Sequence, residues 1–221
     1  MQKKERFELF LKFFTENFPE PETELHYKNP YQLLVSVILS AQCTDKRVNM
    51  VTPAFFNKFP APGHLAAATQ EEVFPFIKSI SYPNNKTRHL IGMARKLVEK
   101  FDSQVPEKVE DLQTLPGVGR KTAHVIASVI FNQPVLAVDT HVFRVSRRIG
   151  LVPENAKTPL SVEKELTRHI PVEMIHKAHH WLIQHGRYIC LARKPKCDLC
   201  GLRNICRYFI RLSANAPDVR N

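Results

Sequence analysis

Four cysteines are grouped near the end of the chain with the spacing C-x6-C-x2-C-x5-C, at Cys190, Cys197, Cys200 and Cys206. Four thiolates form the soft, tetrahedral ligand set of an iron–sulfur cluster or a structural zinc ion. The longer gaps on either side of the two-residue gap let the chain wrap around something larger than one ion, which favours an iron–sulfur cluster over a zinc ion. The remaining cysteine is Cys43, and no signal-peptide pattern precedes it, so a disulfide framework is not expected.

A glycine-rich segment, LPGVGRKTA at Leu115–Ala123, predicts a tight hairpin between two helices. Gly117 and Gly119 permit backbone conformations and close approaches that a side chain would block. A helix beginning near Gly119 would point free N–H groups at an anion, and Arg120 and Lys121 add positive charge there. Such a turn is able to hold a nucleic-acid phosphate without reading base identity, although many glycine turns between helices serve geometry only.

Lys121 and Asp139 are the candidate catalytic residues. A lysine beside a helix N-terminus and other cations is expected to lose its proton more easily, and a neutral amine is able to form a Schiff base with a sugar carbon. A further phosphate contact explains Lys121 equally well. Asp139 directly precedes a predicted helix, and spacing alone favours a helix-capping role for it.

Apolar residues recur at helical spacing along the whole chain, which predicts an all-α fold. Capping patterns at Asn29-Pro30, at Thr69 with Glu72, and at Thr158-Pro159 indicate where helices begin. The short β-rich run 135–138 is expected to connect helices only, and residues 213–221 to form a frayed tail. The predicted helices are one ending before Pro19, one opening at Asn29-Pro30, 44–56, 69–77, 85–101, two flanking 115–119, 140–149, one from Thr158-Pro159, and 171–184.

The chain is basic, with 32 Lys and Arg against 21 Asp and Glu, a formal charge of +11 over 221 residues. This balance suits an anionic polymer bound in a salt-dependent way, although a basic surface without a ligand has the same charge. The apolar run 33–41 is too short to span a bilayer, and the N-terminus lacks a secretory pattern. We therefore expect no membrane partner and a cytoplasmic location, beside the nucleoid if the source is bacterial.

Several motifs occur together and in order: Leu39–Gln42, Leu115–Ala123, Val138–His141, His185–Arg187 and the four-cysteine signature. Jointly they resemble the endonuclease III family, which are helix-hairpin-helix DNA glycosylases with an accompanying lyase activity. The resemblance covers nearly the whole chain.

The family's architecture implies two α-helical lobes with a DNA groove between them. By this resemblance, residues 22–134 form a six-helix barrel that contains the helix-hairpin-helix, at about 112–131. Residues 1–21 and 135–221 form the other lobe, with a 4Fe–4S cluster at 190–206. The four cysteines would be its ligands, and the cluster would shape a basic loop facing the DNA, with Lys194 and Lys196 as its cations.

The resemblance also implies roles for single residues. Lys121 matches the lysine that attacks the sugar C1′, expels the base and forms an imine, and Asp139 matches the catalytic aspartate that assists it. Gln42 matches a residue that fills the space left by the flipped nucleotide. Tyr82 stands where a leucine wedge is usual, which leaves the opposing-base preference open.

Two further residues carry expectations without a role. His124 stands where asparagine is common in the family, and we expect a partly exposed helix residue there. Cys43 is expected to be a small buried side chain.

The function implied is a bifunctional DNA glycosylase and AP lyase of base excision repair, acting as a monomer on double-stranded DNA that contains damaged bases or abasic sites. It would remove oxidised pyrimidines and cleave the strand by β-elimination. A monofunctional mismatch or adenine glycosylase is the alternative enzyme, but such relatives generally lack a lysine at the position of Lys121. A non-catalytic helix-hairpin-helix DNA-binding protein and a zinc-stabilised helical domain are the remaining alternatives.

Overall fold

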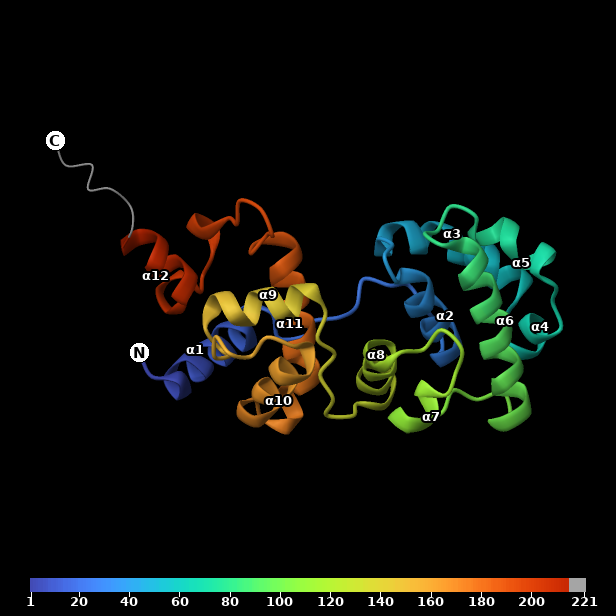
Figure 1. Cartoon of the computed structure of the whole chain (residues 1–221), viewed down its shortest axis with the longest axis horizontal. Helices are drawn as coiled ribbons and strands as arrows, with labels where there is room; N and C mark the ends of the chain where they lie inside the picture. Colours follow the sequence, from blue (N-terminus) through green and yellow to red (C-terminus); the bar gives the residue numbers. More distant parts are fainter. Residues whose placement is uncertain (215–221) are drawn as a thin grey trace. The chain divides into compact units, whose positions relative to one another are not determined.

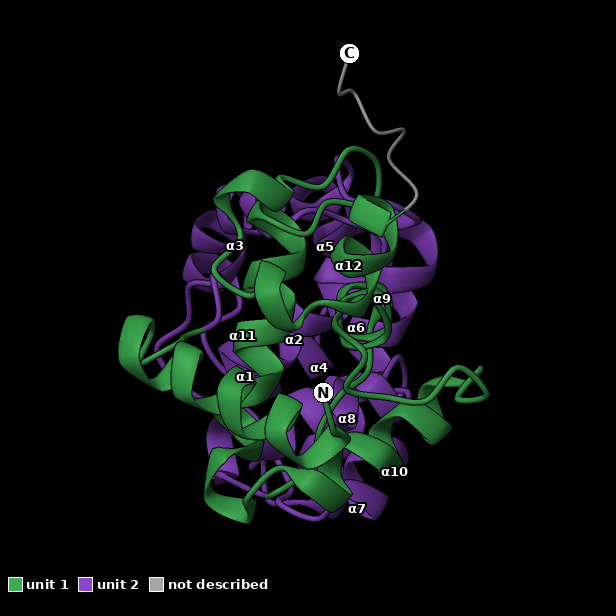
Figure 2. Cartoon of the chain, turned by 90° about the vertical axis from the view of Figure 1, so that its left-hand side faces the viewer, with its two compact units in different colours: residues 1–22, 134–221 green, residues 23–133 purple. Residues whose placement is uncertain are grey.

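The computed structural model describes residues 1–214, and every regular element among them is a helix (Figure 1). The all-α prediction is therefore confirmed. None of the helices in this part of the chain is long and apolar enough to cross a membrane. The chain divides into two compact units, Thr23–Gln133 and Met1–Glu22 with Pro134–Asn221 (Figure 2).

The unit of residues 23–133 packs around one long amphipathic helix. α6 lies against α4 and α5, while α2 lies against α3 and α8. The apolar stripe of α6, including Leu90, Met93 and Leu97, is completely buried. The helices of this unit are α2 (Pro30–Ser40), α3 (Asp45–Lys58), α4 (Pro62–Ala66), α5 (Gln70–Ile77), α6 (Pro83–Lys100), α7 (Val109–Gln113) and α8 (Arg120–Phe131).

The other unit is built around α9, which packs against α10, α11 and α12. Phe10 and Phe14 of the first helix reach its core, where Phe14 stacks on Trp181 with ring centroids 5.5 Å apart. The elements are α1 (Lys3–Asn17), α9 (Thr140–Ile149), α10 (Pro159–His169), α11 (Ile175–Tyr188) and α12 (Arg207–Ala214), with short 3₁₀ turns η1 (Val172–Met174), η2 (Cys197–Leu199) and η3 (Arg203–Ile205).

Helix starts follow the capping chemistry of the sequence. The side chain of Asn29 accepts a hydrogen bond from the backbone N–H of Gln32 at 2.9 Å, as predicted. The capping box of Thr69 and Glu72 is present at the start of α5, and Thr158 caps α10. Residues 135–138 form no strand and connect the two units' helices, as expected.

Other boundaries differ from the predictions. α6 begins at Pro83, two residues earlier than predicted, because proline is well suited to a first helical turn. The helix predicted over 171–184 starts as η1 and continues to Tyr188. α4 and α12 were not predicted, and α12 includes Ser213 and Ala214, where a frayed tail was expected. The rest of that expected tail lies outside the described residues.

Candidate functional site

The glycine-rich hairpin joins α7 to α8 through residues 114–119. Gly117 has φ of +80°, and a Cβ atom there would meet the Cβ of His89 at 2.9 Å. Both the conformation and the close approach expected of Gly117 are therefore present. At Gly119 that expectation is wrong, since φ is −85° and a Cβ would meet nothing within 4 Å. Instead, Gly119 leaves open space in front of the helix that follows it.

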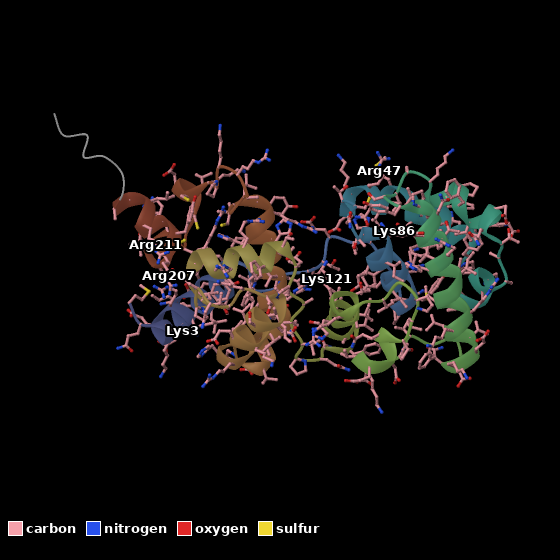
Figure 3. All side chains as sticks on the ribbon, viewed as in Figure 1. Lys3, Arg47, Lys86, Lys121, Arg207 and Arg211 are labelled. Atoms are coloured by element: carbon pink, nitrogen blue, oxygen red, sulfur yellow. The ribbon has the colours of Figure 1, made fainter. Side chains whose placement is uncertain are left out.

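Lys121 lies in the first turn of α8 and is exposed (Figure 3). Arg120 is exposed beside it, and Gly119 occupies the N-cap position without a side-chain hydrogen bond to the helix. The turn therefore combines open backbone N–H groups, a cation and an accessible amine. This combination is able to hold a phosphate group next to a nucleophile.

Asp139 is the N-cap of α9. One carboxylate oxygen, Oδ1, accepts hydrogen bonds from the backbone N–H groups of His141 and Val142, both at 2.8 Å. The capping role favoured by spacing is therefore confirmed. Asp139 lies in the unit formed by residues 1–22 and 134–221, whereas Lys121 lies in the unit of residues 23–133. The cap fixes the half-buried carboxylate in one orientation.

His141, next to this cap, is held in place by the same helix. Its Nδ1 lies 3.1 Å from a guanidinium nitrogen of Arg144, which also donates to the backbone carbonyl of Gly186. Burial lowers the pKa of His141, while the negative charge of Asp139 opposes that shift. The imidazole beside Asp139 is therefore kept neutral at physiological pH.

Gln42 and Tyr82 lie on two neighbouring loops of the same unit. Both have left-handed backbones, with φ of 54° and 56°, and both side chains are exposed. The hydroxyl of Ser81 donates to the carbonyl of Gln42 at 2.7 Å, which joins the loops. Left-handed conformations are costly for residues with side chains and are often found at functional sites. The structure thus brings these two predicted residues together.

A buried lysine supports these loops, and the sequence interpretation gave it no role. Lys86 is only 5% exposed, and its Nζ donates to the carbonyls of Leu39 at 2.8 Å and Ala41 at 2.6 Å. Burial lowers the pKa of Lys86. A signal does exist in the sequence, because Lys86 is in helical register with the buried Leu90 and Leu97.

The four cysteines line a single pocket. Its other lining residues include His185, Ile149 and Phe209. Nε2 of His185 lies 3.5 Å from the Cys200 sulfur, and Arg148 donates to the Cys190 sulfur at 3.5 Å. The predicted grouping of these thiols is therefore present in the fold, within a largely apolar wall.

Four thiols that line one pocket fit the ligand set of a 4Fe–4S cluster. Each cysteine of a 4Fe–4S cluster binds a different iron, so its four sulfurs need not converge on one point. Burial and the neighbouring thiols raise the pKa of Cys200 to about 11 and also raise those of Cys197 and Cys206. Bound iron would supply the positive charge that thiolates need there.

The loop between Cys190 and Cys197 is fastened by Arg148 of α9. The guanidinium of Arg148 donates to the carbonyls of Leu191 at 2.6 Å and Ala192 at 2.9 Å. Lys194 and Lys196 are exposed on this loop, and Lys194 has a left-handed backbone with φ of 50°. Arg148 was missed in the sequence because a basic residue in the last turn of a helix is common for other reasons.

Two minor expectations are wrong. His124 was expected to be partly exposed but is 3% exposed, because it lies on the face of α8 that also buries Ala123 and Ala127. Cys43 was expected to be buried but is half-buried, because it follows the end of α2 in a surface loop.

Comparison with known proteins identifies the class to which this fold and site belong. Residues 35–171 match the model of the HhH-GPD superfamily of base excision DNA repair proteins, and residues 190–206 match the iron-sulfur binding domain of endonuclease III. The chain belongs to the endonuclease III family of base excision repair enzymes, which are DNA glycosylases with AP lyase activity. Its cofactor is a 4Fe–4S cluster.

Curated relatives and solved structures agree with this assignment. The chain is 46% identical to endonuclease III of Rickettsia conorii over 90% of its own length and 94% of that protein. It is 41% identical to endonuclease III of Escherichia coli K12, over 94% and 97% of the two chains. A solved trapped endonuclease III–DNA covalent intermediate matches with a TM-score of 0.90 and 41% identity, over 96% of this chain and all of that one.

Proposed function

We propose that Lys121 is the nucleophile of this glycosylase and lyase. Its amine would attack C1′ of the damaged nucleoside, the C1′–base bond would break, and the base would leave with a proton. The nitrogen lone pair then opens the sugar ring by breaking the C1′–O4′ bond, with a proton passing from nitrogen to O4′, which gives the imine. Loss of a proton from C2′ of this imine breaks the C3′–O bond of the DNA strand by β-elimination. The exposed Lys121 in the first turn of the hairpin helix is the single observation that supports this proposal most. The trapped covalent intermediate of the related endonuclease III supports it too.

Asp139 would act through its negative charge. A fixed carboxylate favours positive charge as it develops on the sugar and is able to take up a proton during turnover. Only Oδ1 is engaged in the two capping hydrogen bonds. Because the cap fixes the carboxylate, no reorganisation would be needed when the charge develops.

DNA would be held mainly through its phosphates. The turn at Gly117, Gly119 and Arg120 offers backbone N–H groups and positive charge, and Lys194 and Lys196 offer further cations. Gln42 would fill the space left by the extruded nucleotide, and Tyr82 would probe the opposite strand by stacking. The hydrogen bond between Ser81 and Gln42 supports a joint action of these two loops.

The four cysteines would hold the 4Fe–4S cluster, which supplies structural support for the basic loop. In the domain assignment we propose, the barrel carries the hairpin and the other lobe carries the cluster. We further propose a monomer whose substrates are oxidised pyrimidines and abasic sites in duplex DNA. Their excision needs nucleotide extrusion, because C1′ is unreachable inside a stacked helix.

The substrate proposal is tested with duplexes that each carry one defined lesion. Duplexes with an oxidised pyrimidine or an abasic site should be cut without heating and leave the β-elimination product. An undamaged duplex and a duplex with a normal mismatch should stay intact. Cleavage of the mismatch alone, or base release without strand cleavage, would overturn the proposed substrate or the proposed lyase step, respectively.

A further inference from the structure

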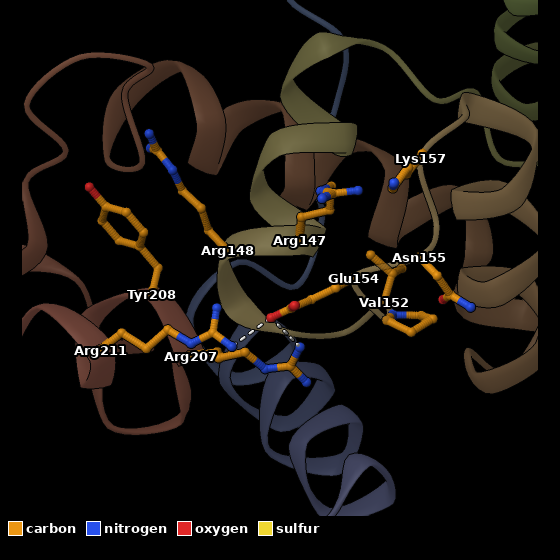
Figure 4. Close-up of a pocket in the computed structure, with 10 residues that line it drawn as sticks. Arg147, Arg148, Val152, Glu154, Asn155, Lys157, Arg207, Tyr208 and Arg211 are labelled. Atoms are coloured by element: carbon orange, nitrogen blue, oxygen red, sulfur yellow. Dashed lines mark hydrogen bonds and ion pairs between the residues drawn. The ribbon is translucent and has the colours of Figure 1, made fainter.

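A second basic site lies at the C-terminal end of α9, at the other end of that helix from Asp139. We name it the α9–α12 pocket (Figure 4). Its volume is about 640 Å³, within the range typical of small-molecule sites. A ten-residue helix spans about 15 Å, so the pocket is well separated from Asp139. It is lined by Arg147 and Arg148 of α9, by Val152, Pro153, Glu154, Asn155 and Lys157 of the following loop, and by Arg207, Tyr208 and Arg211 of α12.

The charge of the pocket is strongly unbalanced. Five cationic side chains and a single carboxylate line it, which leaves a formal charge of +4. The guanidinium of Arg148 already donates to the carbonyls of Leu191 and Ala192, so the cations left to face a ligand are Arg147, Lys157, Arg207 and Arg211. Like charges gathered around one space repel each other, so an anion bound among them would be stabilised. Proteins commonly use arginine for this purpose because its planar guanidinium donates two parallel hydrogen bonds to a phosphate.

Three of the cations are held in place by the fold. Arg147 donates to the carbonyl of Ala156 at 2.5 Å, and Arg148 lies over the ring of Tyr208 at 4.8 Å. The side chain of Arg207 packs so closely against Gly150 that a Cβ atom added to this glycine would lie 3.0 Å from Nε of Arg207. The pocket therefore has a preformed cationic wall, which lowers the entropic cost of binding a ligand.

The remaining charged groups are exposed and free to rearrange. Glu154 pairs with Arg211 at 2.5 Å and with Arg207 at 3.9 Å, as the dashed lines in Figure 4 mark. The side chains of Glu154 and Arg211 are 62% and 64% exposed, so this pairing is weak. Arg211 also lowers the pKa of Glu154, which keeps the carboxylate charged at neutral pH. The carboxylate of Glu154 thus occupies a position beside Arg207 and Arg211 that suits an anionic ligand.

We propose that the α9–α12 pocket binds the diphosphate group of a small anionic molecule, which displaces Glu154 from Arg207 and Arg211. A terminal phosphate group carries about −1.5 to −2 at pH 7 and an inner, linked one about −1, so a diphosphate offsets most of the charge of the pocket. One phosphate group leaves about half of that charge uncompensated. The side chain of Glu154 is 62% exposed, so a compact diphosphate is able to take the place of its carboxylate. This site is independent of the proposed glycosylase chemistry.

The test is calorimetric titration of the full-length protein with inorganic pyrophosphate and, separately, with ADP, at low salt and without divalent cations. We expect saturable binding of one molecule per chain. Lys157→Gln/Arg211→Gln should weaken binding at least about tenfold, because both side chains are exposed and each would lose a charge-assisted hydrogen bond. Glu154→Gln should strengthen it about threefold, since the competing carboxylate is neutralised.

The matched control is Lys4→Gln/Lys164→Gln, which removes two exposed cations of the same unit outside the pocket. Its affinity should stay within about twofold of the wild type. Equal losses in both double variants, or no saturable binding by the wild type, would overturn the proposal. The pocket would instead belong to the DNA contacts if an undamaged duplex displaced pyrophosphate and Lys157→Gln/Arg211→Gln reduced the salt dependence of DNA binding.

Discussion

At the scale of single residues, Asp139 has an observed capping role and a proposed catalytic role, which depend on different properties of its side chain. Its Oδ1 accepts two backbone hydrogen bonds at the start of α9, and this role needs only a short acceptor. The catalytic role that we propose needs the negative charge. A substitution that keeps the acceptor and removes the charge therefore separates the two roles.

Asp139→Asn is expected to melt within about 2 °C of the wild type, because asparagine caps helices about as well as aspartate. It should bind lesion DNA at least as well, because a negative charge is removed. Base excision should slow by about 10² or more, since the charge that assists the reaction is gone. Single-turnover excision rates and thermal melting measure both quantities on the same preparation.

Asp139→Ala serves as the comparison, because it removes the cap as well. That variant should lose about 1 kcal/mol of stability in addition to its activity. Near-normal excision by Asp139→Asn would reduce this residue to a helix cap.

Whether the role of a residue could be predicted depended on how far along the sequence its contact partners lie. The cap by Asp139 could be predicted because both of its partners lie within three positions in the sequence. Lys86 could not be assigned, since its acceptors on Leu39 and Ala41 are more than forty positions away. The left-handed backbone of Tyr82 could not be predicted either, because the type of a side chain rarely indicates this conformation.

At the scale of elements, the hairpin before α8 contains two glycines with different structural roles. Gly117 needs its positive φ and its close approach to His89, whereas Gly119 has an ordinary φ and open space around it. The proposed DNA contact depends on Gly119 and not on Gly117, because a phosphate would approach the helix N-terminus at Gly119.

Gly117→Ala should lower the free energy of unfolding by about 1–2 kcal/mol, because a Cβ is costly in the left-handed region. Gly119→Ala should lower it by about 0.5 kcal/mol or less but still weaken DNA binding, because the added methyl group would stand in front of the open N–H groups. Thermal melting and fluorescence anisotropy with labelled DNA measure the two effects. Full DNA affinity in Gly119→Ala would place the phosphate contact elsewhere.

α11 makes one unit sensitive to acid through a buried histidine. Burial, with smaller contributions from His176 and Arg187, lowers the pKa of His180 to about 4, compared with 6.5 in an unfolded chain. Between these values the unfolded state binds more protons, so stability falls as the pH drops through the window from 6.5 to 4. The full shift corresponds to roughly 3 kcal/mol.

His180→Gln should reduce this loss of stability between pH 6.5 and 4. The pKa of His185 is also lowered to about 4 by burial, and those of His141, His169 and His176 are lowered as well, so part of the pH dependence should remain. Urea unfolding can be followed by the fluorescence of Trp181, the single tryptophan, which is buried in the same unit. His64→Gln, at an exposed histidine of α4, is the control. An unchanged pH dependence in His180→Gln would contradict the buried, neutral state of this histidine.

Elements with caps and a full apolar stripe were predictable from the sequence, and short ones were not. α5 and α10 begin at capping boxes, which are local patterns. α4 has five residues, fewer than two turns, so it has no period to detect. α12 directly follows the last cysteine and spans only eight residues, about two turns, so its apolar pattern is too short to establish a helical period.

At the scale of the whole molecule, the formal charge of +11 indicates that DNA binding is mainly electrostatic. The exposed Lys194 and Lys196 on the loop fastened by Arg148 are proposed phosphate contacts. For B-DNA, log K falls with log salt concentration by about 0.9 per phosphate neutralised.

Lys194→Gln/Lys196→Gln should therefore reduce the salt slope of DNA binding by up to about 1.8, with little dependence on the flanking sequence. Lys4→Gln/Lys164→Gln is again the charge-matched control and should leave the slope unchanged. Binding isotherms between 50 and 200 mM salt, roughly the range over which such slopes are read, measure the effect. An unchanged slope in the first variant would show that the loop faces away from the DNA.

If Lys121 is the nucleophile, its amine becomes covalently bonded to C1′ of the sugar during turnover. Borohydride reduces an imine to a stable amine, so it should trap wild-type protein on duplex DNA that carries an abasic site or an oxidised pyrimidine. Lys100→Gln, which changes an exposed lysine in the last turn of α6, is the matched control and should trap like the wild type.

Lys121→Gln should fold, bind the same duplexes and give no trapped complex and no strand cleavage. Peptide mapping of the wild-type complex should place the reduced sugar on Lys121. Trapping of Lys121→Gln at the wild-type level, or mapping to another amine, would show that Lys121 is not the nucleophile.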